Sequence, residues 1–162
     1  MTRVGIGYDS HRFAAGGPLV LGGLRIEADV HLDGHSDGDA VCHALTDAVL
    51  GAAGLGDIGA LFPDTAAENA GRDSIEMLGL ALERVAAEGW LVAQVDVAVI
   101  SEQVKVAPHR EAMRSRLAAA LGVDTRDVSV KGKTNEGMGW IGRGEGIAVI
   151  AIATLKGRLT PA

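Results

Sequence analysis

A nearly continuous apolar run near the C-terminus, IAVIAIATL, most constrains what this chain can fold into. A strand with one wet face alternates in polarity, whereas a run that is apolar at almost every position suits a buried strand. The run is about half as long as a membrane crossing, which takes roughly 20 residues. We therefore expect a strand buried within a sheet, and no membrane partner.

The other periodic segments predict helices laid against that sheet. Aromatic residues are 3% of the chain and hydrophobic residues 48%, so the core must be built from Ala, Val, Leu and Ile. Helices are expected at about Asp39 to Ala53, Ser74 to Glu88 and residues 107–122, and strands at residues 90–101, 127–133 and 147–156. The chain opens with a strand that we expect to end near Asp9, followed by a hairpin at Gly22-Gly23. This order predicts an α/β (α+β) fold in a single domain, residues 1–162, with helices covering one face of a mixed sheet.

Charge and cysteine content narrow the choice of partner and compartment. The net charge is −6 and no Lys/Arg cluster is present, which argues against a nucleic-acid partner. An anionic substrate would need metal cations or helix N-termini to offset this charge. Cys42 is the single cysteine, so no intrachain disulfide can form. Together with an opening segment that does not resemble a leader, this predicts a cytoplasmic protein.

The stretch GHSDGDAVCHALTDA, residues 34–48, is rich in metal-ligating residue types. At about 100° per residue, Asp39, His43 and Asp47 stack on the side of the expected helix opposite its apolar stripe. They are either a solvated polar face, or a metal-binding His43 whose tautomer the two carboxylates hold. The near absence of Lys and Glu from this helix favours the second reading.

Asp9 and His11 project to the same side of an extended segment, with Cβ atoms roughly 6 to 7 Å apart. The pair alone is weak evidence, because a D-x-H pattern is frequent by chance. With His43 it makes two imidazoles and one carboxylate, which leave the fourth tetrahedral position of a zinc ion open for a substrate. His35 and Ser36 precede a helix N-terminus, where they either receive phosphate oxygens or simply cap the helix.

The loop TNEGMGWIGRGEG follows the expected strand at residues 127–133. Lys133, Thr134 and Asn135 could surround phosphates with N–H and hydroxyl donors. Glu136 would repel a phosphate unless a cation lay between them. It is therefore either a second metal ligand or a surface charge.

Taken together, these segments resemble the 2-C-methyl-D-erythritol 2,4-cyclodiphosphate synthase family over almost the whole chain. The resemblance rests on GYDSHRF, LGGLRI, HSDGDAVCHALTDAVLGAAGLGDIGALFPDT, VDVAVI and VKGKTNEGMGWIGRGEGIA. It implies a Zn2+ ion on Asp9, His11 and His43, and a Mg2+ or Mn2+ ion on Glu136 and the substrate phosphates. It also implies catalytic hydrogen bonds from His35 and Thr134. Further substrate contacts are implied for Ser10, Ser36, Asp57, Ile58, Gly59, Phe62, Pro63, Asp64, Thr65, Ala66, Ser101, Lys105, Val106, Ala107, Lys133, Asn135, Trp140 and Arg143.

The same resemblance implies a reaction and an assembly. The substrate is a cytidyl diphosphate, 4-diphosphocytidyl-2-C-methyl-D-erythritol 2-phosphate, which cyclises with release of CMP in the non-mevalonate pathway to isoprenoid precursors. The family forms homotrimers with sheets facing the threefold axis and active sites between subunits. Arg143 is expected near that axis, beside a cavity that accepts isoprenoid diphosphates.

Four residues depart from the family pattern: Val104, Lys133, Asn135 and Trp140. They bear on the fit of the cytosine-binding segment and of the phosphate loop, and not on the reaction. Two other functions stay open at this point. One is a zinc-dependent phosphohydrolase that uses the same three ligands, and the other is an isoprenoid-diphosphate-binding or metal-storing trimer without catalysis.

Overall fold

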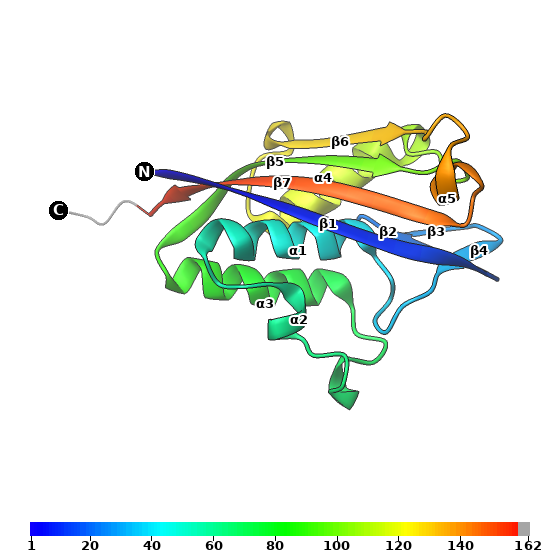
Figure 1. The fold of residues 1–162 in the computed structure, drawn as a ribbon. Helices are drawn as coiled ribbons and strands as arrows, with labels where there is room; N and C mark the ends of the chain where they lie inside the picture. Colours follow the sequence, from blue (N-terminus) through cyan, green and yellow to red (C-terminus); the bar gives the residue numbers. More distant parts are fainter. Residues whose placement is uncertain (159–162) are drawn as a thin grey trace.

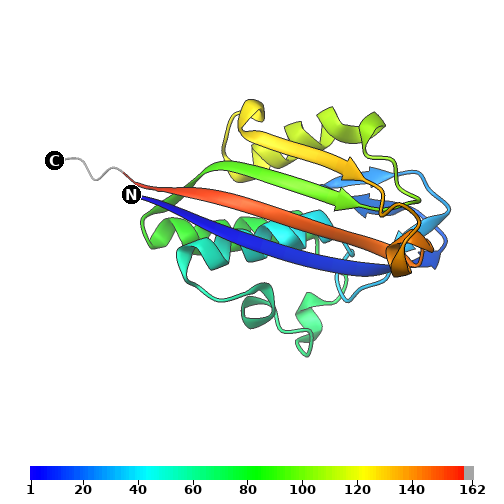
Figure 2. The same cartoon turned by 45° about the horizontal axis from the view of Figure 1, so that its top comes forward.

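The computed structural model describes residues 1–158, which form a mixed sheet with helices on one side (Figure 1, Figure 2). The five-stranded sheet has the order β4-β1-β7-β5-β6, in which only the β5–β6 pair is parallel. Its strands are β1 (Thr2–Ala15), β4 (Val30–Leu32), β5 (Trp90–Ile100), β6 (Val128–Lys133) and β7 (Gly146–Gly157). A separate hairpin pairs β2 (Leu19–Leu21) with β3 (Leu24–Ile26) across the predicted turn at Gly22-Gly23.

The three long helices are the predicted ones. They are α1 (Ala40–Ala53), α3 (Ser74–Ala87) and α4 (Arg110–Leu121). Asp39 and Asp73 cap the first two by accepting backbone N–H groups of the first turn, and Gly54 ends α1 in a left-handed conformation. Short turns of helix complete the chain: α2 (Ile58–Leu61), α5 (Gly139–Gly142), η1 (Ala67–Asn69), η2 (Ala107–His109) and η3 (Thr125–Asp127). Among residues 1–158, no helix has the length and apolar character to cross a membrane.

The C-terminal apolar run forms β7, at the centre of the sheet between β1 and β5. One of its faces packs against the helices, where Ile147, Val149 and Leu155 are fully buried. On the opposite face, Ile150 and Ile152 are 36% and 41% exposed. The predicted burial therefore holds for one face of the strand, because the helices among residues 1–158 cover only one side of the sheet.

The first strand is longer than predicted. We expected it to end near Asp9, but β1 continues to Ala15 because it pairs with β7 as far as Arg12 and with β4 beyond that point. The short strand β4 lies between the hairpin and α1, where we predicted no strand. Backbone pairing does not require apolar side chains, so Asp9 and His11 lie within a strand and not at its tip.

Helix α1 lies directly on β1 because two glycines leave no side chain between them. A Cβ atom on Gly7 would lie 1.8 Å from the carbonyl oxygen of Ala44, and one on Gly5 would lie 2.1 Å from that of Ala48. Ordinary van der Waals contact begins at 3.4 Å. The close approach of strand and helix therefore depends on glycine at both positions, and it fixes the distance between the side chains of β1 and those of α1.

Candidate active site

Strand β1 and helix α1 bring Asp9, His11 and His43 together. His11 Nε2 lies 2.8 Å from Asp9 Oδ2, and His43 Nδ1 lies 3.1 Å from the same oxygen. The two imidazole nitrogens are 3.2 Å apart. Asp9 and His11 share a face of β1 because they are two residues apart. The predicted convergence of strand and helix is thus present, and it involves one named atom from each of the three side chains.

The three atoms fit one divalent cation. Zn–N and Zn–O distances near 2.0–2.1 Å in a tetrahedral site place the ligand atoms about 3.3 Å from one another, close to the 2.8 to 3.2 Å found here. His11 Nδ1 lies 2.7 Å from the carbonyl oxygen of Asp33, which can only accept. His11 therefore carries its proton on Nδ1, which leaves the lone pair of Nε2 directed at the cluster. Three protein ligands leave the fourth position open.

The Asp9 carboxylate and the neighbouring imidazoles stabilise each other's charged forms. Burial disfavours the charged forms of Asp9 and His11, but hydrogen bonding and charge attraction between the carboxylate and the imidazoles outweigh it. The pKa of Asp9 is therefore lowered and the pKa of His11 is raised from their ordinary values. The lowered pKa keeps Asp9 ionised at neutral pH, which is the form that a cation binds.

The carboxylates on either side of His43 along α1 do not hold its imidazole, so this prediction is wrong. Asp39 is fully buried and accepts the two N–H groups of the Gly22-Gly23 turn at 2.9 and 2.7 Å. Asp47 accepts the N–H of Ile58 at 2.7 Å. Backbone N–H groups that have no partner in a helix or strand need an acceptor. Asp39 provides one at the hairpin turn, and Asp47 provides one at the start of α2. Helical spacing predicts which residues share a side of α1, but it does not predict the hydrogen-bond partners of Asp39 and Asp47.

Two serine hydroxyl groups lie within hydrogen-bond distance of the His43 imidazole instead. Its Nε2 lies 2.8 Å from Ser74 Oγ and 2.9 Å from Ser36 Oγ. Sequence reasoning missed Ser74, whose position at the start of α3 indicates only helix capping. The contact comes from the packing of α3 beside α1, which no local pattern reveals.

A cavity of about 360 Å³ opens beside the three ligands. It is lined by Asp9, His11, His35, Ser36, His43, Ile58, Gly59, Phe62, Pro63, Asp64, Asn69 and Met77. Asn69 and Met77 were not predicted. Three predicted contacts, Asp57, Thr65 and Ala66, do not line this cavity, and Asp57 instead caps α2 by accepting the N–H of Ala60 at 2.8 Å.

A second cavity, of about 150 Å³, lies where β5 and β6 end. Its lining residues are Ser101, Val104, Lys105, Val106, Ala107, Arg110, Gly132, Lys133 and Thr134. Thr134 Oγ1 donates to Glu136 Oε1 at 3.0 Å. The two cavities share no lining residue, so residues 1–158 of one chain do not bring Thr134 to Asp9, His11 and His43.

Glu102 follows Ser101 of the second cavity and forms hydrogen bonds with the glycine-rich loop. One of its carboxylate oxygens accepts the N–H groups of Asn135 at 2.8 Å and Gly137 at 3.2 Å. Glu136, between them, has a left-handed backbone with φ of 52°, a conformation that costs a non-glycine residue free energy. Sequence reasoning missed Glu102, because a single acidic residue after a strand carries no pattern.

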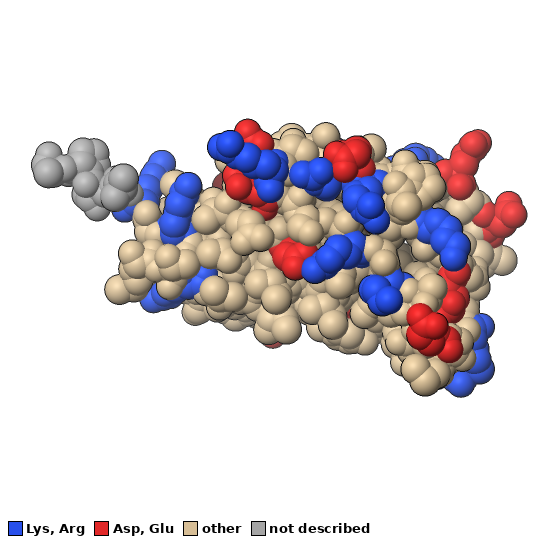
Figure 3. All heavy atoms as spheres, turned by 90° about the horizontal axis from the view of Figure 1, so that it is seen from above, with Lys and Arg blue, Asp and Glu red and all other residues tan. Residues whose placement is uncertain are grey.

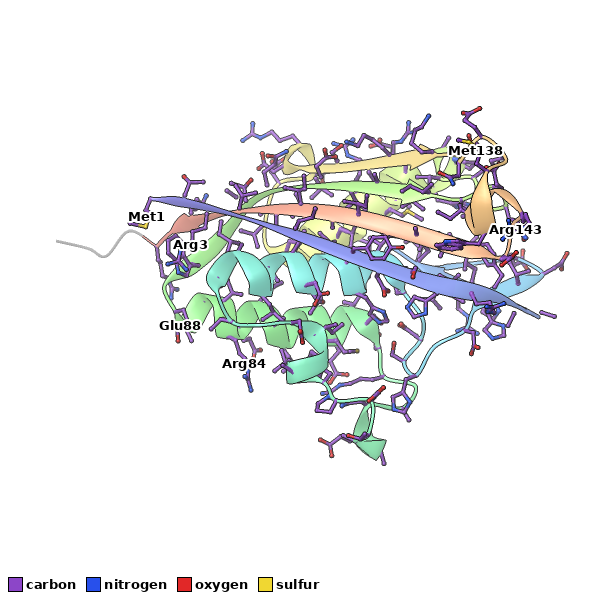
Figure 4. All side chains as sticks on the ribbon, in the orientation of Figure 1. Met1, Arg3, Arg84, Glu88, Met138 and Arg143 are labelled. Carbon is purple, nitrogen blue, oxygen red and sulfur yellow. The ribbon has the colours of Figure 1, made fainter. Side chains whose placement is uncertain are left out.

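The remaining predicted residues gather near α5. A third cavity, of about 390 Å³, is lined by Ser10, His11, Arg12, Trp140 and Glu145. Arg143 Nε donates to Glu145 at 2.6 Å. Figure 4 shows Arg143 beside α5, at the end of the molecule opposite Met1 and Arg3. Asn135 donates its side-chain N–H to the carbonyl oxygen of Met138 at 2.8 Å.

The fold and the site define an α/β protein in which Asp9, His11 and His43 fit one divalent cation beside an adjoining cavity. Residues 2–156 match the model of the YgbB family. The chain belongs to this family.

Two curated relatives and one solved structure with similar chains carry the same activity in their names. A 2-C-methyl-D-erythritol 2,4-cyclodiphosphate synthase of Gemmatimonas aurantiaca is 64% identical, over 96% of this chain and 93% of the relative. One of Chromobacterium violaceum is 54% identical, over 96% and 98%. A solved structure of such a synthase in a CDP-bound form has a TM-score of 0.88 at 39% identity, over 95% of this chain and all of that one. The bifunctional IspDF of Campylobacter jejuni has a TM-score of 0.93 at 41% identity, and the match covers 97% of this chain and 42% of that protein.

Proposed function

We propose that this chain converts 4-diphosphocytidyl-2-C-methyl-D-erythritol 2-phosphate to 2-C-methyl-D-erythritol 2,4-cyclodiphosphate and CMP, in the non-mevalonate route to isoprenoid precursors. The observation that carries the proposal is the convergence of Asp9 Oδ2, His11 Nε2 and His43 Nδ1 beside a cavity that holds His35 and Ser36. The activity named for relatives up to 64% identical supports it.

The reaction is an intramolecular phosphoryl transfer. An oxygen of the 2-phosphate forms a bond to the β-phosphorus, the bond from that phosphorus to the bridging oxygen breaks, and CMP leaves with the electron pair. Because the attacking oxygen is already anionic at neutral pH, the site needs no strong general base. Catalysis then comes from positioning and from stabilising charge.

Each group of residues has a distinct task in this proposal. Asp9, His11 and His43 hold Zn2+ and Glu136 holds Mg2+ or Mn2+; these ions neutralise phosphate charge when bound. His35, Ser36 and Thr134 donate hydrogen bonds to phosphate oxygens. The residues that enclose the erythritol are Ile58, Gly59, Phe62, Pro63 and Asp64, and the segment at 101–107 receives the cytosine.

The same proposal includes a homotrimer with active sites between subunits. Two features support it. The cavity with the zinc ligands and the cavity with Thr134 are separate in one chain, although both are needed for one substrate. The sheet face that no helix covers has a broad stretch without charged side chains (Figure 3), and the exposed apolar residues of β1 and β7 are Val4, Ile6, Tyr8, Ile150 and Ile152. Packing these faces around a threefold axis would bury them.

An isoprenoid diphosphate on that axis belongs to the proposal as well. Trp140 supplies apolar surface to the cavity near α5, and Arg143 stands beside it with a guanidinium that can pair with a diphosphate.

Product analysis tests the reaction. The purified protein is incubated with the cytidyl substrate, Zn2+ and Mg2+, and CMP and the cyclic product are expected in equal amounts. Inorganic phosphate or an opened diphosphate would instead indicate a zinc phosphohydrolase. Absence of turnover with retained binding of an isoprenoid diphosphate would indicate a binding protein.

Matched histidine variants locate the activity. His43→Ala should abolish formation of both products. His31→Ala should keep both products, because within residues 1–158 the lost imidazole bonds only the carbonyl oxygen of Gly16. Full turnover by His43→Ala would contradict the proposed site.

A further inference from the structure

A chain of hydrogen bonds runs outward from His43, on the side away from the other two ligands. His43 Nε2 lies 2.8 Å from Ser74 Oγ, and this hydroxyl donates a hydrogen bond to Asp37 Oδ1. The other carboxylate oxygen of Asp37 accepts the backbone N–H of Ser74 at 3.0 Å. Ser74 is fully buried. Asp37 therefore holds Ser74 through both its backbone N–H and its hydroxyl group.

The donors along this chain can be assigned from chemistry. An ionised carboxylate only accepts, and a serine hydroxyl has a single proton to donate. Because Ser74 gives its proton to Asp37, its oxygen can only accept from His43. His43 then carries a proton on Nε2, and in the neutral ring the lone pair of Nδ1 is directed at Asp9 Oδ2 and His11 Nε2, the two atoms that a bound cation would share.

Ser36 does not impose the same choice, although its Oγ lies 2.9 Å from the same nitrogen. In the described part of the chain its one other bond is a long one, in which it accepts the N–H of Gly38 at 3.4 Å. With no carboxylate to take its proton, the Ser36 hydroxyl can either donate or accept. It also lines the cavity, where a substrate can reorient it.

We propose that Ser74, oriented by Asp37, is a positioning residue of the metal centre that fixes the tautomer and the ring orientation of His43. Asp37 Oδ1 also accepts the N–H of Asp39 at 3.1 Å, so the same carboxylate joins the starts of α1 and α3. Helix α3 thus supplies no metal ligand but holds one in the binding-competent form. This role rests on the proposed metal-dependent function of the site.

The affinity for Zn2+ tests the proposal without reference to turnover. Partners that orient a metal-ligating histidine typically contribute 10- to 100-fold in metal affinity. Competition with a chelator should therefore show the dissociation constant of Ser74→Ala raised by about 10- to 100-fold, with affinity largely restored in Ser74→Thr. Thr46→Val is the matched control: it removes a buried hydroxyl of α1 that bonds only the carbonyl oxygen of Cys42, and it should bind Zn2+ as the wild type does.

A second measurement reports the tautomer directly. ¹⁵N NMR of the metal-free wild-type protein should show neutral His43 as the Nε2–H form, and Ser74→Ala should show a mixture. Wild-type His43 in the Nδ1–H form would overturn the proposal, even if Ser74→Ala failed to fold. Unchanged Zn2+ affinity in a folded Ser74→Ala would overturn this role of Ser74 alone, whereas no Zn2+ binding by the wild type would overturn the metal centre itself.

Discussion

Replacing Gly7 by alanine should separate the strand that carries Asp9 and His11 from the helix that carries His43. The new Cβ would lie 1.8 Å from the carbonyl oxygen of Ala44, the residue that follows His43, whereas ordinary contact begins at 3.4 Å. Relief of this overlap requires a local movement of about 1.6 Å. The obstructing atom is a backbone atom of a helix, so it cannot rotate away.

The expected cost follows from this geometry. Overpacking typically destabilises a protein by about 1–3 kcal/mol, and we expect Gly7→Ala to lose about 3 kcal/mol or more. The movement would also carry His43 Nδ1 away from Asp9 Oδ2 and His11 Nε2, which now lie at 3.1 and 3.2 Å. Gly7→Ala should therefore bind Zn2+ much more weakly, even where it stays folded.

Guanidinium denaturation and a Zn2+ titration measure the two effects. Gly51→Ala is the matched control, because Gly51 lies in the same helix and a Cβ there meets nothing within 4 Å. It should leave Zn2+ affinity unchanged and raise stability by about 0.5–1 kcal/mol. Wild-type stability and wild-type Zn2+ affinity in Gly7→Ala would refute the view that glycine sets this distance.

Three further predictions concern other parts of the chain. Burial raises the pKa of the Cys42 thiol well above its ordinary value, so a thiol reagent at pH 8 should label it only after unfolding, and rapid labelling of the native protein would contradict this. Glu102→Ala should raise the Mg2+ concentration needed for half-maximal turnover. Glu102→Gln should keep it near normal, because one side-chain oxygen accepts the N–H groups of both Asn135 and Gly137. Equal effects of the two substitutions would contradict the view that these two hydrogen bonds position Glu136. Asp39→Ala removes a helix cap and two acceptor contacts to the hairpin turn, and should cost about 3 kcal/mol or more in chemical denaturation; a loss below about 1 kcal/mol would contradict this role.

Features that depend on a few neighbouring residues, such as helix starts and the shared face of a strand, could be predicted from the sequence. The start of α1 at Asp39 and the shared face of Asp9 and His11 follow from local sequence patterns alone. The partners of His43 did not follow, because Ser74 reaches it only through the packing of α3 against α1. The strand β4 was missed for a related reason: its three residues pair with β1, and the pairing partner decides their conformation.

The convergence of Asp9, His11 and His43 on one divalent ion is the central claim. Crystals grown with Zn2+ and measured at the zinc absorption edge test it most directly. The expected anomalous peak lies about 2.0–2.2 Å from Asp9 Oδ2, His11 Nε2 and His43 Nδ1, with its open side toward the cavity that contains His35 and Ser36. A zinc ion bound through His43 Nε2, or one that contacts only some of the three side chains, would contradict the claim.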